Sequence, residues 1–265
     1  MLGRGSSLAR HAGDARRHPL TFDDTGDPAG FPVLYCHGGG DSRLSRHPDD
    51  SIAASLGVRL VAVERSGPPV EGRTLVTFAR DVEALADGLG LDRFATLGWS
   101  AGGPHALAVA GVLGDRVTRV ALVGSMPPPD LLSLLARDVR LSVRLASLAP
   151  RLLTGRLEAW GRRPTPPTGR SDTDDAYGRG RQESFRAGGA WLARELAVLG
   201  RPWGFELAEV GAPVTLWWGA SDPVCPPAIG RAYAARLPQA KFRVVPGNHQ
   251  LLFAAWREIL ADLRA

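Results

Sequence analysis

Short apolar runs alternate with helical patterns along most of this chain, and several of the runs end in glycine. The runs with the character of buried strands are 33–36, 58–64, 94–99, 117–125, 213–219 and 241–247. Between two of them, Leu75, Phe78 and Val82 recur with the periodicity of an amphipathic helix. Strands that alternate with helices favour a mostly parallel central sheet flanked by helices. The sequence therefore predicts an α/β fold.

One long stretch, residues 126–209, interrupts this alternation. It opens with "PPPD" and continues with a leucine-rich helix through Leu148. The segment "GRRPTPPTGRSDTDDAYGRGR" at 161–181 then has a loop-like composition. A simple connection in a compact domain is much shorter. We interpret the stretch as a helical lid, inserted after the sixth strand over the edge where open α/β sheets bind ligands. The expected organisation is a basic tail at 1–18, a core at 19–125 and 210–265, and a helical cap at 126–209.

Charge and composition exclude several other classes of protein. The formal net charge is +5, and all but one of the 32 Lys and Arg residues are arginine. These arginines are scattered rather than gathered in a stripe with aromatic residues, so we expect no nucleic-acid partner. No apolar run is long enough for a membrane span, and the first residues lack the apolar core of a secretory signal. We therefore expect a cytoplasmic location and no membrane partner. Cys36 and Cys225 show no metal-ligand spacing.

Ser100 lies between Gly98 and Gly102, after an apolar run and before an alanine-rich one. The spacing G-x-S-x-G fits a tight, strained turn that presents one hydroxyl to solvent. A serine hydroxyl is a weak nucleophile unless a base accepts its proton. His249 in "VVPGNHQLLF" follows the last expected strand and is the candidate base. The other histidines lie in the tail, in a charged loop, in the helix after Ser100 or at the start of a glycine run, where packing or anchoring roles suit them better.

Asp222 is the candidate that would orient His249. It lies three residues beyond Gly219, which ends a strongly hydrophobic run, and Pro223 restrains the turn. The order Ser100, Asp222, His249 is the chain order of one hydrolase fold in particular. Three other aspartates fall in the loop-like part of the lid, where we expect them to be solvated: Asp172, Asp174 and Asp175.

The glycine run "HGGG" at 37–40 supplies a candidate for stabilising an oxyanion. Acyl transfer needs N–H donors where negative charge develops. The backbone N–H of Gly39 and that of Ala101, at the start of a helix, are the two expected donors. Asp41 follows this run directly. Because an inward carboxylate would oppose the developing charge, we expect Asp41 to point outward.

Taken together, "HGGG", "GWSAGG", "GASDPVCP" and "PGNHQL" resemble the α/β-hydrolase superfamily, and the resemblance covers about Leu20 to Leu263. The branch it is most similar to is that of capped serine hydrolases, the esterases and aminopeptidase-like enzymes. The resemblance implies a nucleophile, acid and base at Ser100, Asp222 and His249, an oxyanion hole at Gly39 and Ala101, and neither cofactor nor metal. Only Asn248 separates Gly247 from His249, where many relatives have two residues.

The leading interpretation is a cofactor-independent serine hydrolase that cleaves an ester, lactone or amide of a small, fairly apolar substrate. The same fold and triad also serve C–C bond hydrolysis, perhydrolysis, and lyase or cyclase steps in biosynthesis. A non-catalytic small-molecule binding protein is the third interpretation. Dehalogenase chemistry is disfavoured, because that branch has an aspartate where Ser100 stands. The expected partner is the substrate, and the sequence leaves a homodimer open.

Overall fold

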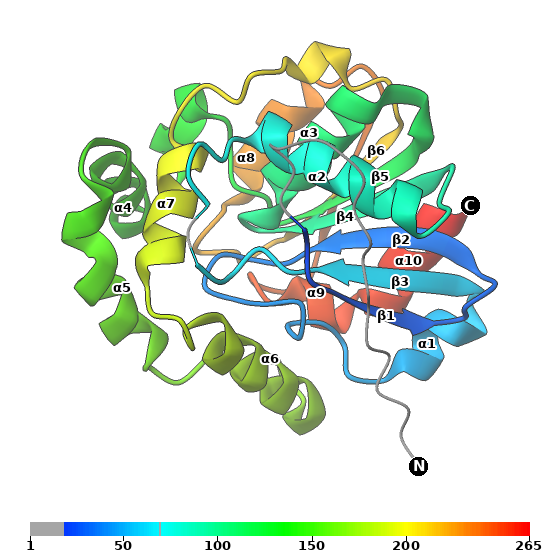
Figure 1. Ribbon diagram of the computed structural model, residues 1–265, viewed down its shortest axis with the longest axis horizontal. Helices are drawn as coiled ribbons and strands as arrows, with labels where there is room; N and C mark the ends of the chain where they lie inside the picture. The colour runs from blue at the N-terminus through cyan, green and yellow to red at the C-terminus, as the bar shows by residue number, and fades with distance from the viewer. Residues whose placement is uncertain (1–18, 69) are drawn as a thin grey trace.

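The computed structural model describes residues 19–68 and 70–265 (Figure 1). The predicted basic tail at 1–18 lies outside the described residues. The strands are β1 Phe22–Gly26, β2 Phe31–Cys36, β3 Val58–Val63, β4 Phe94–Trp99, β5 Val117–Val123, β6 Val214–Gly219 and β7 Ala240–Val245. They form one sheet in the order β1-β3-β2-β4-β5-β6-β7, in which β1 runs antiparallel to β3 and the other neighbours are parallel. The predicted mostly parallel sheet is confirmed.

Helices cover both faces of the sheet. The helices outside residues 126–209 are α1 Asp50–Ser55, α2 Leu75–Gly88, α3 Gly102–Leu113, α8 Pro227–Ala234, α9 Leu251–Ala254 and α10 Trp256–Arg264. Side chains alternate between the two faces along each strand. In β2, Leu34 and Cys36 belong to the apolar cluster that includes α2, α3 and α8, whereas Val33 and Tyr35 belong to the cluster that includes α1, α9 and α10. The short apolar runs of the sequence are therefore strands buried on both sides.

The ends of α2 show how local sequence sets the length of a helix. Thr74 is its N-cap, and the Thr74 hydroxyl oxygen accepts a hydrogen bond from the backbone N–H of Thr77 at 3.1 Å. Gly90 follows the helix with a φ of 67°, in the left-handed region that favours glycine. The chain then turns directly into β4, the strand that leads to Ser100.

The strand order brings two loops together at one edge of the sheet. From β2 the chain crosses to β3 on one side, and from β3 it crosses to β4 on the other side of β2. The carboxyl ends of β2 and β4 are thus neighbours, with Cys36 opposite Gly98. Such a switch point is where open α/β sheets bind ligands. The glycine run after β2 and Ser100 after β4 meet there.

Residues 126–209, called the helical segment below, lie between β5 and β6. Their helices are α4 Arg137–Leu148, α5 Thr154–Gly161, α6 Ser171–Ser184 and α7 Ala190–Leu199, with short 3-10 turns at Pro129–Leu134, Pro150–Leu153 and Leu207–Glu209. Figure 1 shows α4 to α7 gathered at one end of the sheet. The segment follows the fifth strand of the described chain, one earlier than the expected count, because only β1 precedes β2 there. Its division from the core as a separate cap stays a prediction.

The prediction that 161–181 is loop-like was wrong for its second half, which forms α6. Apolar content is low there, but Thr173, Tyr177, Gly180 and Ser184 are buried at helical spacing. Gly180 allows close packing, since a Cβ at that position would lie 2.0 Å from the Ser45 Oγ. The acidic residues are concentrated in the first turn, where carboxylates interact favourably with the helix dipole. A polar helix with one small-residue face was thus mistaken for a loop.

The outer face of the helical segment carries apolar side chains. Leu148 is 86% exposed and Leu152 is 75% exposed, and Leu141 also lies on the surface. These leucines belong to short helices: among the described residues, no helix has both the length and the apolar character to cross a membrane.

Candidate active site

Ser100 sits on a strained turn between β4 and α3. Its φ of 53° makes it the only non-glycine residue with a positive φ within residues 19–68 and 70–265. The turn is held on both sides, because the Ser100 N–H donates to Val123 O at 2.9 Å and the Ser100 carbonyl accepts from Met126 N–H at 3.0 Å. Unfavourable backbone conformations of this kind persist where the surrounding structure holds them, often at functional sites.

The two glycines around Ser100 are explained by close contacts. A Cβ on Gly102 would lie 2.0 Å from the carbonyl oxygen of Cys36. A Cβ on Gly98 would lie 2.6 Å from the carbonyl oxygen of Gly102. Both positions therefore need glycine so that α3 can begin directly against the end of β2. The G-x-S-x-G spacing follows from this packing.

His249 and Asp222 complete a hydrogen-bonded chain with Ser100. The His249 Nδ1 lies 2.8 Å from the Asp222 Oδ2, and its Nε2 lies 2.9 Å from the Ser100 Oγ. A carboxylate can only accept from Nδ1–H, so Nε2 is left to accept from the serine hydroxyl. All three residues are buried. The short loop with Asn248 does not displace His249.

Backbone contacts fix Asp222 in turn. Its Oδ1 accepts hydrogen bonds from the N–H groups of Val224 and Cys225, each at 2.9 Å. Gly124, directly after β5, provides the space: a Cβ there would lie 2.9 Å from the Asp222 Oδ2 and 3.3 Å from the His249 Nδ1. Sequence reasoning missed Gly124. Its position after a strand was visible, but the contact with the triad depends on the order of the strands.

The structure places Gly39 beside Ala101, the two positions expected to donate to an oxyanion. A Cβ on Gly39 would lie 3.2 Å from the Ala101 Cβ and 3.5 Å from the Leu192 Cδ1. Ala101 is the N-cap of α3, so its N–H lies at the positive end of that helix. Leu192 comes from α7 and covers the loop. The assignment of the two N–H groups as an oxyanion hole stays a prediction.

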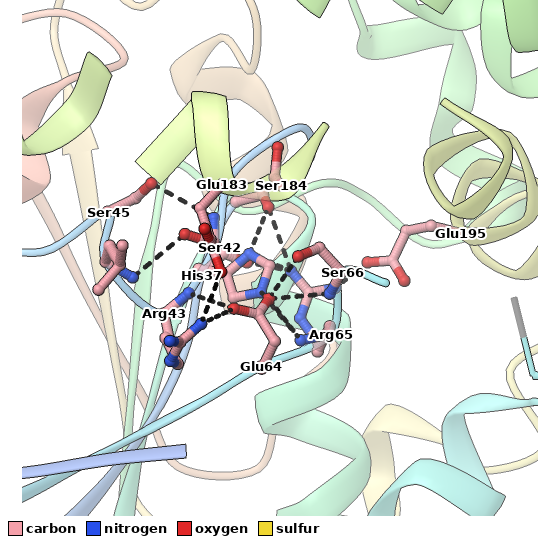
Figure 2. Close-up of polar contacts among 12 residues, drawn as sticks. His37, Ser42, Arg43, Ser45, Glu64, Arg65, Ser66, Glu183, Ser184 and Glu195 are labelled. Atoms are coloured by element: carbon pink, nitrogen blue, oxygen red, sulfur yellow. Dashed lines mark hydrogen bonds and ion pairs between the residues drawn. The ribbon is translucent and has the colours of Figure 1, made fainter. Parts of the chain in front are cut away.

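His37 anchors the loop at 37–41, as the sequence indicated. The ring is fully buried, with Nδ1 2.9 Å from Gly38 O and Nε2 3.1 Å from the N–H of Arg65 (Figure 2). The Nε2 atom lies equally close, 3.1 Å, to the Oε1 of Glu64, a carboxylate oxygen that can only accept. Burial and the charge of Arg65 lower the pKa of His37, although the contact with Glu64 acts to raise it. His37 therefore fixes the loop and does not face Ser100.

Arg65 links that loop to the helical segment. Its guanidinium donates to the carbonyl oxygens of His37 and Gly38 and forms an ion pair with Glu195 on α7 (Figure 2). The side chains of both ion-pair partners are nearly inaccessible to solvent. Removing one partner of such a pair leaves an uncompensated buried charge. Sequence reasoning missed this pair, because the two residues lie 130 positions apart with no pattern that connects them.

Helices α5 and α6 cover the other side of the same loop. The Ser184 Oγ donates to Gly40 O at 2.9 Å. Trp160 lies against Gly40, where an added Cβ would come within 2.3 Å of the indole ring. The Arg181 guanidinium stacks 4.0 Å above the Trp160 ring and donates to the Tyr177 hydroxyl at 3.2 Å. The helical segment thus places aromatic rings and a cation beside the candidate site.

The expectation that Asp41 points outward was wrong. Its side chain is buried, and a Cβ on Gly38 would lie 2.6 Å from the Asp41 Oδ2. Gly40, with a φ of 77°, turns the chain inward just before it. Burial raises the pKa of Asp41 to about 7, although the charges of Arg181 and His249 act to lower it. A carboxyl group that holds its proton below this pH carries no charge to oppose an oxyanion.

A cavity of about 540 Å³ opens between the loop after β3 and α7. Its lining includes Arg65, His105, Trp191 and Glu195. None of the three triad residues lines it, so it is separate from Ser100. His105 is buried in its wall with Nδ1 3.1 Å from Ala101 O, a packed histidine as the sequence indicated.

No group of His, Cys, Asp or Glu side chains suited to a metal occurs in the part of the chain that the structure describes. Cys36 and Cys225 are both buried and free. Burial raises the pKa of the Cys36 thiol to about 11, so it is a thiol at neutral pH. The absence of a cofactor stays a prediction.

Comparison with known proteins defines the family. A model described as the alpha/beta hydrolase fold matches residues 32–254, and the chain belongs to this family. Among solved structures, a thermophilic esterase from Thermogutta terrifontis superposes with a TM-score of 0.68 at 24% identity, covering 93% of this chain and 94% of that one. A likeness at that identity shows the shared fold.

Two curated relatives match a shorter stretch. A non-heme chloroperoxidase from Streptomyces lividans is 33% identical over 115 residues, which is 41% of this chain and 42% of that protein. Haloalkane dehalogenase 2 from Mycobacterium bovis is 35% identical over 116 residues, 41% of this chain and 39% of that protein. The matched stretch thus spans about two-fifths of each relative.

Proposed function

We propose that this protein is a cofactor-independent serine hydrolase that cleaves an ester, lactone or amide of a small, fairly apolar substrate. The observation that carries the proposal is the continuous hydrogen-bonded chain from Ser100 through His249 to Asp222. The positive φ of Ser100 also supports the proposal, since this conformation presents the hydroxyl at the N-terminal end of α3. The family membership supports a hydrolase.

Acylation follows from this geometry. The Ser100 Oγ attacks the substrate carbonyl carbon while its proton passes to the His249 Nε2, 2.9 Å away. Asp222 stabilises the imidazolium that forms. The N–H groups of Gly39 and Ala101 would donate to the oxyanion. His249 then returns the proton to the leaving alcohol or amine, the bond to that group breaks, and the acyl group remains on Ser100.

Deacylation reverses the proton transfers. Water donates a proton to the His249 Nε2 and attacks the acyl carbonyl carbon. The second tetrahedral intermediate collapses, the bond to the Ser100 Oγ breaks, and the serine oxygen regains a proton from His249. The products are the carboxylic acid and the free enzyme. No step requires a group that the described residues lack.

Perhydrolysis is the second candidate, favoured by the match to a non-heme chloroperoxidase. In that reaction hydrogen peroxide replaces water as the nucleophile on the acyl-enzyme, and a peracid leaves. Haloalkane dehalogenation does not suit a serine nucleophile. Displacement of halide by the Ser100 Oγ would give an alkyl ether, which has no carbonyl group for water to attack.

A fluorophosphonate tests the proposal without knowledge of the substrate. We expect one covalent adduct in the intact mass of the wild-type protein and none on Ser100→Ala. Ser55→Ala, which changes an exposed serine on α1, is the matched control and should react like wild type. A folded wild-type protein that gains no adduct, or a Ser100→Ala variant that still gains one, would contradict the proposal. Ester, lactone and amide panels, with and without peroxide, then separate the two candidates.

A further inference from the structure

Arg181 is a buried cation that forms no ion pair with any described residue. It lies on α6 with 5% of its surface exposed, stacked on Trp160. One of its terminal nitrogens donates to the Tyr177 hydroxyl, but its Nε has no hydrogen-bond partner. Among the described residues, no carboxylate oxygen lies within ion-pairing distance of the Arg181 guanidinium. Burying an unpaired charge is costly, so the burial of Arg181 requires an explanation.

Arg65 shows what a structural arginine looks like in the same molecule. Its Nε also lacks a hydrogen-bond partner, but its terminal nitrogens pair with Glu195 and donate to two backbone carbonyl oxygens. The ion pair with Glu195 thus gives the buried Arg65 guanidinium a counterion. The two arginines therefore differ in the ion pair: Arg65 has one, and Arg181 has none among the described residues.

Asp41 follows Gly40, which lies against the Trp160 ring on which Arg181 stacks. Its side chain is 2% exposed, and the Oδ1 atom has no hydrogen-bond partner. The charges of Arg181 and His249 both act on Asp41. Asp41 and Arg181 nonetheless form no ion pair. Each thus presents an unsatisfied polar atom beside the loop that holds Gly39.

We propose that Arg181 binds a carboxylate carried by the substrate, with Asp41 contacting the same group. The inference rests on the proposed hydrolase function and narrows its substrate class to carboxylate-bearing esters or lactones. A guanidinium offers several N–H donors in the geometry that a carboxylate accepts. Trp160 and Tyr177 hold Arg181 in place, so little side-chain entropy is lost on binding. Below about pH 7 the protonated Asp41 can donate to the bound carboxylate rather than repel it.

Binding of hexanoate and hexanamide, measured by titration calorimetry on the full chain near pH 6.5, tests the inference. The two probes share a shape and differ in charge. We expect hexanoate to bind at least about tenfold more tightly than hexanamide, since a charge-assisted hydrogen bond is stronger than a neutral one. Arg181→Met should remove this preference, whereas Arg181→Lys should keep part of it. Arg179→Met is the matched control, because Arg179 lies exposed on the same helix.

Equal affinity for the two probes in the wild type, or a preference that survives Arg181→Met, would overturn the inference. If Arg181→Met fails to fold, the wild-type comparison and Arg181→Lys still decide the question. A purely structural role for Arg181 would change stability without changing the ratio of the two affinities. The titration needs no turnover, so its failure is distinct from a failure of Ser100 to react with the fluorophosphonate.

Discussion

Buried polar groups at the strand ends and those beside the helical segment differ in how fully they are hydrogen-bonded. At the strand ends, Ser100, His249 and Asp222 are bonded to one another, and Asp222 is bonded to the backbone as well. On the side that the helical segment covers, Arg181 and Asp41 each keep an unpartnered atom. A group that is fully bonded has one geometry, whereas a group left unpartnered is available to something else. Under the proposed function, the core would fix the chemistry and the helical segment would determine recognition.

Packing shows the same contrast. The sheet is buried on both faces by two apolar clusters, with strands such as β4 wholly inaccessible to solvent. The helical segment exposes leucines on its outer face and reaches the loop at 37–41 through specific contacts, such as Ser184 with Gly40 and Glu195 with Arg65. Substitutions at the strand ends should thus affect rate, whereas those in or facing the helical segment should affect binding and stability.

Asp222→Asn should give the largest effect. The amide can no longer accept from the His249 Nδ1–H with a charge that stabilises the imidazolium, so we expect kcat on a reactive ester to fall about 10²- to 10⁴-fold. Asp92→Asn, which changes an exposed aspartate, is the control and should keep the wild-type rate. A loss smaller than about fivefold would contradict the role of Asp222. It would also contradict the expectation that substitutions at the strand ends mainly affect the rate.

Asp41→Asn should change how stability depends on pH. Because its pKa is about 7 in the folded protein, Asp41 there holds a proton that the unfolded chain releases near pH 4. The wild-type free energy of unfolding should therefore lose about 2 to 4 kcal/mol as the pH rises from 4 to 7. Asparagine does not titrate, so the variant gains relative to wild type over this window and stays ahead at higher pH.

Denaturant unfolding at a series of pH values measures this difference. The exposed Asp92→Asn variant again serves as the control for a change of net charge. A difference between Asp41→Asn and wild type that stays constant from pH 4 to pH 8 would mean that Asp41 ionises normally. The helical segment would then not create a distinct environment around it.

Two glycines on α6, Gly180 and Gly178, give the smallest expected effects, and each serves as the control for the other. Gly180→Ala would place a Cβ 2.0 Å from the Ser45 Oγ and 2.9 Å from the Ser45 N, so the helix must move away from the core. We expect a loss of about 1 to 3 kcal/mol in the free energy of unfolding. Gly178→Ala meets only the Thr165 Oγ1 at 4.0 Å and should instead gain up to about 1 kcal/mol from helix propensity. Equal effects in thermal or denaturant unfolding would show that α6 does not depend on this close contact.

Much of the fold and of the candidate triad could be predicted, because the signals are local. Each apolar run that ended in glycine is a strand, and each triad candidate follows a strand directly: Ser100 after β4, Asp222 after β6 and His249 after β7. Parallel strands bring their carboxyl ends to one edge, so residues that are far apart in the chain become neighbours there. The hydrogen-bonded geometry of Ser100, His249 and Asp222 follows from this topology.

The remainder could not be predicted, because it depends on contacts between distant segments. Asp41 turns inward under α6, and a charge argument about an exposed loop could not foresee that cover. The helix α6 itself is buried through small and polar residues such as Thr173 and Gly180, which do not register in a hydrophobic pattern. The partnership of Arg65 with Glu195 has no signature in sequence spacing.

That partnership also limits how the family could exchange parts. A graft of the helical segment from a relative onto this core would bring a new α7 against the unchanged Arg65. Unless the graft supplied a carboxylate where Glu195 stands, Arg65 would keep its contacts with the carbonyl oxygens of His37 and Gly38 but lose its ion pair. The loop at 37–41 would then lose part of its support, and the proposed hydrolysis would slow although Ser100, His249 and Asp222 had been kept. Arg65 and Glu195 should therefore be inherited, or engineered, as a single unit.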